Sequence, residues 1–438
     1  MKKRTAAFLL AFLCMAFLAA RQYFVNYTGL FTVLCLVVLA AGALACQKEG
    51  SFFPAGAGGF AFVCGLVRLA GAPYFVNRLF VFAAVLWQIL VLVPVLREKK
   101  GFSVCLTILT VLVNILVLLD VSSGSFYIRL MQRTAFHVQN SFDAPPEESV
   151  SLDGGVTLIR NISYHSAYPN GFLDVYLSQQ AEKESCPTFL FVHGGGFTWG
   201  DKTDGDPNGG AGGGQQWYFA ELLKAGYNIV SMNYALAPEY RYPTPVLQLC
   251  EAVSFLKVHD EEYGISMDRV IFSGGSAGGS IAGQFVCAQT DPDYSKKTGI
   301  PQVMDADRIR AVVFASALLD GTRYYKTGSV GFDFMLNECG RVYLGEDFAT
   351  GKTAKETNLI DLVTAAFPPV YLSDGNNGSF TDQAADMEKR LQELGVPVTF
   401  TYYEENVETL GHGFEIFDTP CGKDNLARTI RFLDETVQ

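Results

Sequence analysis

Basic residues are the minority charge in this sequence of 438 residues, where 33 Lys and Arg stand against 44 Asp and Glu. The formal net charge of −11 argues against nucleic-acid binding, which needs a basic face toward the phosphates. Ten cysteines are too few for a compact disulfide scaffold, and a hydrophobic content of 49% is too high for a disordered chain. The sequence therefore describes a folded protein with a large core.

Acidic residues are nearly absent from residues 1–120, where only Glu49, Glu98 and Asp120 accompany ten basic residues. The remainder of the chain is acidic and has the composition of an ordinary globular domain. The average charge thus combines two unlike parts. We predict a transmembrane anchor of four to five helices over residues 1–120, a juxtamembrane linker over 121–155 and a catalytic domain over 156–438.

The anchor prediction rests on apolar stretches close to the roughly 20 residues that a bilayer span needs. They are Thr5–Ala20, Thr28–Cys46, Leu79–Leu96 and Phe102–Leu119, with a glycine-containing fifth at Phe52–Ala70. The basic residues favour five spans that place the catalytic domain outside the cytoplasm. We therefore expect an integral, multi-pass protein with the lipid bilayer as a partner. A cleaved signal peptide over Met1–Ala20 is the alternative for the first stretch.

The predicted linker contains one helical segment, Phe126–Phe136, which is either an amphipathic helix on the membrane surface or a plain connecting helix. Pro145 and Pro146 then predict an exposed hinge.

From residue 156 onward, strand-like runs alternate with helical ones. This alternation predicts a mostly parallel sheet with helices on both faces. Strands are expected at Val156–Ser163, Phe172–Ser178, Thr188–Val192, Tyr227–Asn233, Arg269–Phe272, Ile309–Ala315, Val370–Ser373 and Val398–Tyr403. Helices are expected at Trp217–Lys224, Val246–Glu262, Gly278–Gln289, Asp382–Leu394 and Asp424–Val437.

A G-x-S-x-G motif, Gly274-Gly275-Ser276-Ala277-Gly278, follows one predicted strand and opens a helix. This context is typical of a nucleophile elbow, whose sharp turn crowds the residues two before and two after the serine. The motif predicts Ser276 as a nucleophile. A serine that merely caps the helix is the alternative.

Glycines also follow the predicted strand Thr188–Val192, in His193-Gly194-Gly195-Gly196-Phe197. Glycines allow a backbone to approach a substrate closely and to adopt positive φ. The run therefore predicts an oxyanion hole, in which backbone N–H groups face the charge that develops on the substrate oxygen. An ordinary glycine turn is the alternative.

Histidine is scarce, with five residues in the chain, and only His412 lies after Ser276. In a protein with an elbow serine, the acid and then the histidine follow the nucleophile along the chain. Elimination therefore predicts His412 as the general base, against the alternative of a buried structural histidine.

These motifs resemble the hormone-sensitive-lipase-like (HGGG) carboxylesterases of the α/β-hydrolase fold over about residues 185–435. Tyr234-Ala235-Leu236-Ala237-Pro238-Glu239 and Pro368-Pro369 add to the resemblance. It implies a carboxylic-ester hydrolase that forms an acyl-serine and needs neither cofactor nor metal. It further implies an oxyanion hole from Gly195, Gly196 and Ala277, and a small-molecule, glycan or lipid ester as substrate.

The chain departs from this family at the triad acid. The family's Asp would fall near Gly378, where this sequence has no acidic residue. Asp374, at the end of a predicted strand, is the favoured candidate because the glycine-rich turn after it lets its carboxylate face His412. Asp382, Glu405, Glu408 or an Asn are the alternatives.

Two other functions stay open. One is a serine peptidase or amidase on the same fold, and the other is a non-catalytic membrane receptor or scaffold with a degenerate triad. The stretch Asp320–Phe367 is expected either to form part of a lid or to pack in the core. Five cysteines after residue 120 form an odd set, so at least one is expected to be free.

Overall fold

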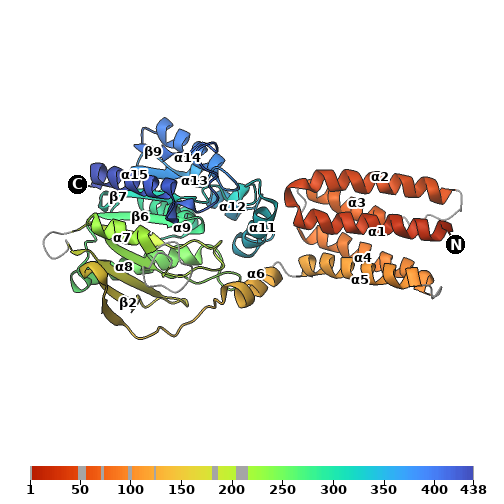
Figure 1. The fold of residues 1–438 in the computed structure, drawn as a ribbon, viewed down its shortest axis with the longest axis horizontal. Helices are drawn as coiled ribbons and strands as arrows, with labels where there is room; N and C mark the ends of the chain where they lie inside the picture. The colour runs from red at the N-terminus through yellow and green to blue at the C-terminus, as the bar shows by residue number, and fades with distance from the viewer. Residues whose placement is uncertain are drawn as a thin grey trace. The chain divides into compact units, whose positions relative to one another are not determined.

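The computed structural model describes residues 2–47, 56–70, 74–96, 101–122, 125–179, 186–203 and 216–437 (Figure 1). The chain packs as two units. The first comprises Met1–Tyr127 and Val330–Arg341, and the second comprises Ile128–Ser329 and Val342–Gln438. The domain boundaries expected at residues 120 and 155 stay a prediction.

The first unit is a helical bundle. Its helices are α1 (Lys2–Tyr23), the short η1 (Val25–Tyr27), α2 (Thr28–Gln47), α3 (Gly56–Leu69), α4 (Tyr74–Leu96) and α5 (Gly101–Ser122). Small buried side chains such as Cys14, Ala61 and Ala84 let these helices approach closely. Aliphatic side chains, among them Val33 and Leu86, are exposed on the outward faces.

Part of α11 (Val330–Leu344) belongs to this bundle. The Asp333 carboxylate accepts a hydrogen bond of 2.6 Å from the Asn26 amide, and the Phe334 ring lies 5.0 Å from the Tyr23 ring. This segment lies within the stretch expected to form a lid or core. It packs against α1 and the residues after it.

The predicted membrane anchor is contradicted. Among the helices that the structure describes, none is both long enough and apolar enough to cross a bilayer. The helix over the fifth expected span, α3, has 14 residues, which at 1.5 Å per residue is about 21 Å against a hydrocarbon core of about 30 Å. Buried polar residues, including Arg21, Gln88 and Asn114, lie within other helices. The multi-pass localisation with an extracytoplasmic catalytic domain is therefore wrong.

The second unit is built on a nine-stranded sheet with the order β1-β2-β3-β5-β4-β6-β7-β8-β9. Its strands are β1 (Glu148–Ser151), β2 (Thr157–Ser163), β3 (Phe172–Leu177), β4 (Thr188–Val192), β5 (Asn228–Met232), β6 (Val270–Gly275), β7 (Ile309–Ala315), β8 (Val370–Ser373) and β9 (Val398–Thr401). Pairing is antiparallel from β1 through β3 to β5 and parallel across the other strands. The predicted, mostly parallel sheet is thus confirmed.

Helices lie on both faces of this sheet (Figure 1). The helices after the bundle are α6 (Ser125–Met131) with a π-helical turn (Gln132–Phe136), α7 (Gln216–Lys224), α8 (Thr244–Tyr263), α9 (Ala277–Thr290), α10 (Pro292–Thr298), α12 (Lys352–Glu356), α13 (Leu359–Leu362), α14 (Thr381–Glu393) and α15 (Pro420–Val437), besides α11. Short 3-10 turns are η4 (Asp153–Gly155), η6 (Ala306–Arg308), η7 (Gly321–Arg323) and η8 (Phe414–Ile416).

Successive residues of β6 show how the sheet is covered. Ile271 packs in a core that includes Phe219 of α7 and Leu433 of α15, whereas the next residue, Phe272, lies 4.7 Å from the Phe285 ring of α9. This alternation follows from the period of two along a strand. All eight predicted strands and five predicted helices are present. The exposed β1 lies inside the segment that was predicted as a linker.

Candidate active site

Ser276 lies at the sharp turn from β6 into α9, with φ 52° and ψ −119°. Such a positive φ is strained for a non-glycine residue and is held by its surroundings. A Cβ at Gly274 would lie 2.3 Å from the Gly278 carbonyl carbon, and one at Gly278 would lie 2.0 Å from the Val192 oxygen. The predicted crowding on both sides of the serine is present. The Ser276 side chain makes no capping hydrogen bond, which disfavours the helix-cap alternative.

The glycine run lies beside this turn. A Cβ on Gly194 would be 3.4 Å from the Ser276 Cβ. The next three residues all have positive φ, 93° at Gly195, 58° at Gly196 and 64° at Phe197. Within the described residues, the N–H groups of Gly195 and Gly196 donate to no backbone acceptor. Ala277 begins α9, so its N–H also has no partner one turn back in the helix.

Aromatic residues fix the glycine run in place. The buried His193 ring stacks on the Tyr234 ring at 4.1 Å, and the Tyr234 hydroxyl donates to the carbonyl oxygens of His193 and Gly194, each at 3.0 Å. Phe197 stacks on Tyr343 with ring centroids 3.7 Å apart. His193 is therefore a structural histidine that supports the loop.

The helical segment predicted over Phe126–Phe136 also supports this loop. The buried Gln132 amide donates to the carbonyl oxygens of Thr198, at 2.7 Å, and Ala237, at 2.9 Å. Phe136 stacks on Trp199 at 4.4 Å. Sequence reasoning missed this role because nothing in the segment's own pattern indicates which loop it contacts.

His412 lies in the turn between β9 and α15, and burial lowers its pKa to about 4. The neighbouring Gly413 N–H donates to the Ser316 hydroxyl at 3.0 Å, and the Ser276 N–H donates to the Ala315 carbonyl at 3.0 Å. Ser276 and His412 are therefore both held against consecutive residues at the end of β7. At neutral pH the His412 imidazole is uncharged, as a general base requires.

The Ser379 side chain contacts His412, with its Oγ 2.9 Å from His412 Nδ1. Asp374, the predicted acid, follows β8 as expected but is buried behind this contact, with 1% of its surface exposed. Burial raises its pKa well above the ordinary range, and the Ser379 hydroxyl acts in the opposite direction. Neither Asp374 carboxylate oxygen accepts a hydrogen bond of standard geometry from the described residues.

The alternative acids face elsewhere. Asp382 pairs with Arg323 at 2.9 Å on the surface of α14. Glu405 accepts a hydrogen bond from the Asn377 amide, and the Asn376 amide donates to two backbone oxygens of Tyr403 and Glu408.

A second buried acid, Glu415, was missed by sequence reasoning. Its carboxylate accepts hydrogen bonds from the hydroxyls of Ser316, at 3.0 and 2.9 Å, and Ser373, at 3.1 Å. Burial raises its pKa to about 7, and its charge adds to the raised pKa of Asp374. Its position three residues after His412 was the signal that could have revealed it.

Cysteines of the second part of the chain include free thiols. Cys250, Cys287 and Cys421 are buried and form no disulfide bond. The prediction of at least one free cysteine is confirmed.

Several known proteins that are similar to this chain are named as esterases or lipases. The chain is 26% identical over 249 residues to esterase LipI of Mycobacterium tuberculosis, covering 53% of this chain and 67% of that protein. It is 34% identical over 107 residues to lipase 2 of a Moraxella species, covering 24% of this chain and 23% of that protein. The crystal structure of esterase B from Lactobacillus rhamnosis superposes with a TM-score of 0.54 at 21% identity, over 66% of this chain and 88% of that one.

These likenesses and the sheet define the class of protein, a carboxylic-ester hydrolase with the α/β-hydrolase fold. The BD-FAE family model matches residues 173–391, which is half of the chain, and the chain belongs to that family. The predicted fold and enzyme class are confirmed at this level. The match begins at residue 173, so it does not include helices α1 to α5 of the first unit.

Proposed function

We propose that the protein hydrolyses carboxylic esters through an acyl-serine intermediate on Ser276, with His412 as the general base. The observation that carries this proposal is the strained elbow of Ser276 beside a glycine run with positive φ at Gly195 and Gly196. A half-buried elbow serine next to N–H groups that have no backbone acceptor is suited to acyl transfer.

In the first half of the reaction, neutral His412 takes the Ser276 proton as Oγ attacks the ester carbonyl carbon. The oxyanion that forms is stabilised by the N–H groups of Gly195, Gly196 and Ala277. Because Ala277 is the first residue of α9, the positive end of the helix dipole adds to this stabilisation. His412 then gives its proton to the departing alcohol, which leaves the acyl-Ser276 ester.

In the second half, a water molecule attacks the acyl-enzyme carbonyl. His412 takes the proton from this water and then gives it to Ser276 Oγ, as the tetrahedral intermediate collapses to free Ser276 and the carboxylic acid.

We propose that the Asp374 carboxylate stabilises the protonated His412 indirectly, through a hydrogen bond to Ser379. For Nε2 of His412 to accept a proton, Nδ1 must carry the hydrogen and donate it to Ser379 Oγ. The Ser379 hydroxyl proton is then available to the Asp374 carboxylate. Asp374 thus stabilises the imidazolium indirectly, as an orienting group.

The substrate is proposed to be a small-molecule ester or an acyl ester of a glycan or lipid. The esterase and lipase names of the matched proteins support an ester, whereas nothing in the described site favours an amide.

The proposal is tested by hydrolysis of 4-nitrophenyl butyrate by the purified full chain. Ser276→Ala is expected to lower kcat by at least about 10⁴-fold, because it removes the nucleophile. The matched control is Ser149→Ala on the exposed strand β1, which is expected to keep wild-type activity. Unchanged turnover by Ser276→Ala would contradict the serine mechanism. A wild-type protein that hydrolyses 4-nitroanilides but not esters would favour an amidase.

A further inference from the structure

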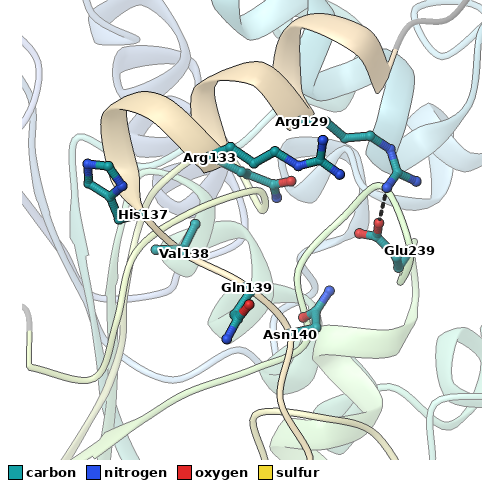
Figure 2. Close-up of a pocket in the computed structure, with 8 residues that line it drawn as sticks. Arg129, Arg133, His137, Val138, Gln139, Asn140 and Glu239 are labelled. Atoms are coloured by element: carbon teal, nitrogen blue, oxygen red, sulfur yellow. Dashed lines mark ion pairs between the residues drawn. The ribbon is translucent and has the colours of Figure 1, made fainter.

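A cavity of about 600 Å³ opens beside the helical segment that supports the glycine run (Figure 2). Two arginines of that segment line it, together with the residues that follow the segment and an acidic residue from the loop after β5. The lining residues are Arg129, Gln132, Arg133, His137, Val138, Gln139, Asn140 and Glu239.

The positive charge of this cavity exceeds its negative charge. Arg129 forms an ion pair of 2.7 Å with Glu239, the one acid in the lining. Arg133 forms no ion pair with any residue that the structure describes. In Figure 2 the Arg133 and Arg129 side chains extend from the same helical segment, and both line the cavity. Two cations one helical turn apart repel each other, so an anion between them would be stabilising.

The walls of the cavity are fixed by buried hydrogen bonds. Gln132, 8% exposed, is held by the carbonyls of Thr198 and Ala237. The Asn140 side chain accepts from the Leu236 N–H at 2.7 Å and donates to the Leu236 carbonyl at 3.0 Å. The two guanidiniums therefore project from a backbone that is tied to the loop carrying Glu239, and a ligand would meet a site organised in advance.

The segment that lines the cavity also contacts the loop of the proposed oxyanion hole. Phe136, in the same segment as Arg133, stacks on Trp199 with an angle of 8° between the rings. Gln132 holds Thr198, which directly follows Phe197 of the glycine run. A group bound by Arg133 would thus be held by a segment that directly contacts the residues following the glycine run.

We propose that this cavity binds an anionic group, carboxylate or phosphate, carried by the ester substrate, with Arg133 as its main contact and Arg129 held in place by Glu239. The planar guanidinium fork matches either anion and gives charge-assisted hydrogen bonds. This inference rests on the proposed ester hydrolysis and specifies its substrate class as esters that carry a negative charge.

The first test compares anionic and neutral esters in two arms. An acyl-side arm pairs mono(4-nitrophenyl) glutarate with 4-nitrophenyl butyrate, and an alcohol-side arm pairs 1-butyrylglycerol 3-phosphate with 1-butyrylglycerol. In at least one arm the wild type is expected to prefer the anionic ester in kcat/KM. Arg133→Gln is expected to lower that preference about tenfold or more, mostly through KM. The control Arg431→Gln removes an exposed arginine of α15 and is expected to keep the preference.

A second test measures binding without turnover. Inorganic phosphate and glutarate are titrated into Ser276→Ala protein at low ionic strength, where screening is weak. Arg133→Gln in this background is expected to raise Kd about tenfold, with thermal melting showing that it remains folded. The anion site alone would be overturned if the wild type hydrolysed neutral esters as well as anionic ones and if Arg133→Gln left the Kd values for phosphate and glutarate unchanged. If the wild type hydrolysed none of the esters, the proposed function itself would be overturned.

Discussion

Ser379 Oγ lies 2.9 Å from His412 Nδ1, in the place where a triad carboxylate would be expected. Asp374 is buried behind it, and the Ser379 hydroxyl helps to hold down the pKa of that carboxyl. A neutral hydroxyl orients an imidazole through one hydrogen bond but stabilises the imidazolium less than a carboxylate does. We therefore expect Ser379 to orient His412 and Asp374 to stabilise its imidazolium indirectly, through Ser379.

Replacing Ser379 tests its orienting role. Ser379→Ala removes the hydrogen-bond partner of His412 Nδ1 and is expected to lower kcat about tenfold to a hundredfold, less than the ~10⁴-fold loss that follows disruption of a triad carboxylate. Ser379→Asp places a carboxylate beside Nδ1 and is expected to recover more activity than Ser379→Ala. Steady-state kinetics with 4-nitrophenyl butyrate measures both, with Ser149→Ala as control. Wild-type kcat in Ser379→Ala would contradict the orienting role.

Asp374 is expected to affect His412 through Ser379, so the effects of replacing the two residues on kcat should not be independent. Asp374→Asn keeps the shape of the side chain and removes its charge, so kcat should fall about tenfold. In a double-mutant cycle, Ser379→Ala with Asp374→Asn should lose little more than Ser379→Ala alone, because the serine carries the connection. Strictly additive losses in log kcat would show that Asp374 acts by another route.

The pH dependence of kcat/KM reports the proposed base. Burial lowers the pKa of His412 to about 4, and only the neutral imidazole accepts the Ser276 proton. The rate should therefore stay level down to about pH 5 and decline only as the pH approaches 4. Circular dichroism at each pH checks that the protein remains folded. An acid limb centred near the unperturbed histidine value of about 6.5 would contradict this environment for His412.

The buried Glu415 is expected to make stability depend on pH. Its folded pKa of about 7 exceeds the ordinary 4.5, so its contribution to stability is complete below about pH 4.5 and is lost as pH rises through 7. The loss is roughly 3 kcal/mol. Glu415→Gln lacks this titration, so the difference in unfolding free energy between wild type and variant should change by that amount from pH 4.5 to 8. A constant difference would mean that Glu415 stays ionised throughout.

The elbow glycines are expected to be indispensable for packing. Gly278→Ala would place its Cβ 2.0 Å from the Val192 carbonyl oxygen, so we expect a destabilisation of about 2–4 kcal/mol in urea unfolding. Gly331→Ala in α11 is the matched control, because no atom lies within 4 Å of its added Cβ. Equal stability of the two variants would contradict the crowded turn.

Much of the catalytic fold could be predicted from local pattern. Thr188–Val192, Ile309–Ala315 and Val370–Ser373 are found as strands with the predicted bounds, since short apolar runs between turns are strongly biased toward buried strands. The elbow at Ser276 was predictable because its steric demand is local and requires small neighbours.

Other features depend on contacts between distant parts of the chain. No local pattern indicates that Ser379 contacts His412, 33 residues later, or that Gln132 holds the Thr198 carbonyl. Asp374 as the triad acid therefore stays a prediction, and the contact of Ser379 with His412 Nδ1 was not foreseen. The anchor prediction failed because it considered the apolarity of each stretch alone, whereas the described helices bury Arg21, Gln88 and Asn114 in a bundle.

The central claim is that Ser276 is a working nucleophile activated by His412. The most direct measurement is labelling of the full chain with a fluorophosphonate, followed by peptide mass spectrometry. The account predicts one adduct per chain, located on Ser276, with labelling slowed by orders of magnitude in His412→Ala. A protein that is folded and yet remains unlabelled at Ser276, or that labels as fast without His412, would contradict it.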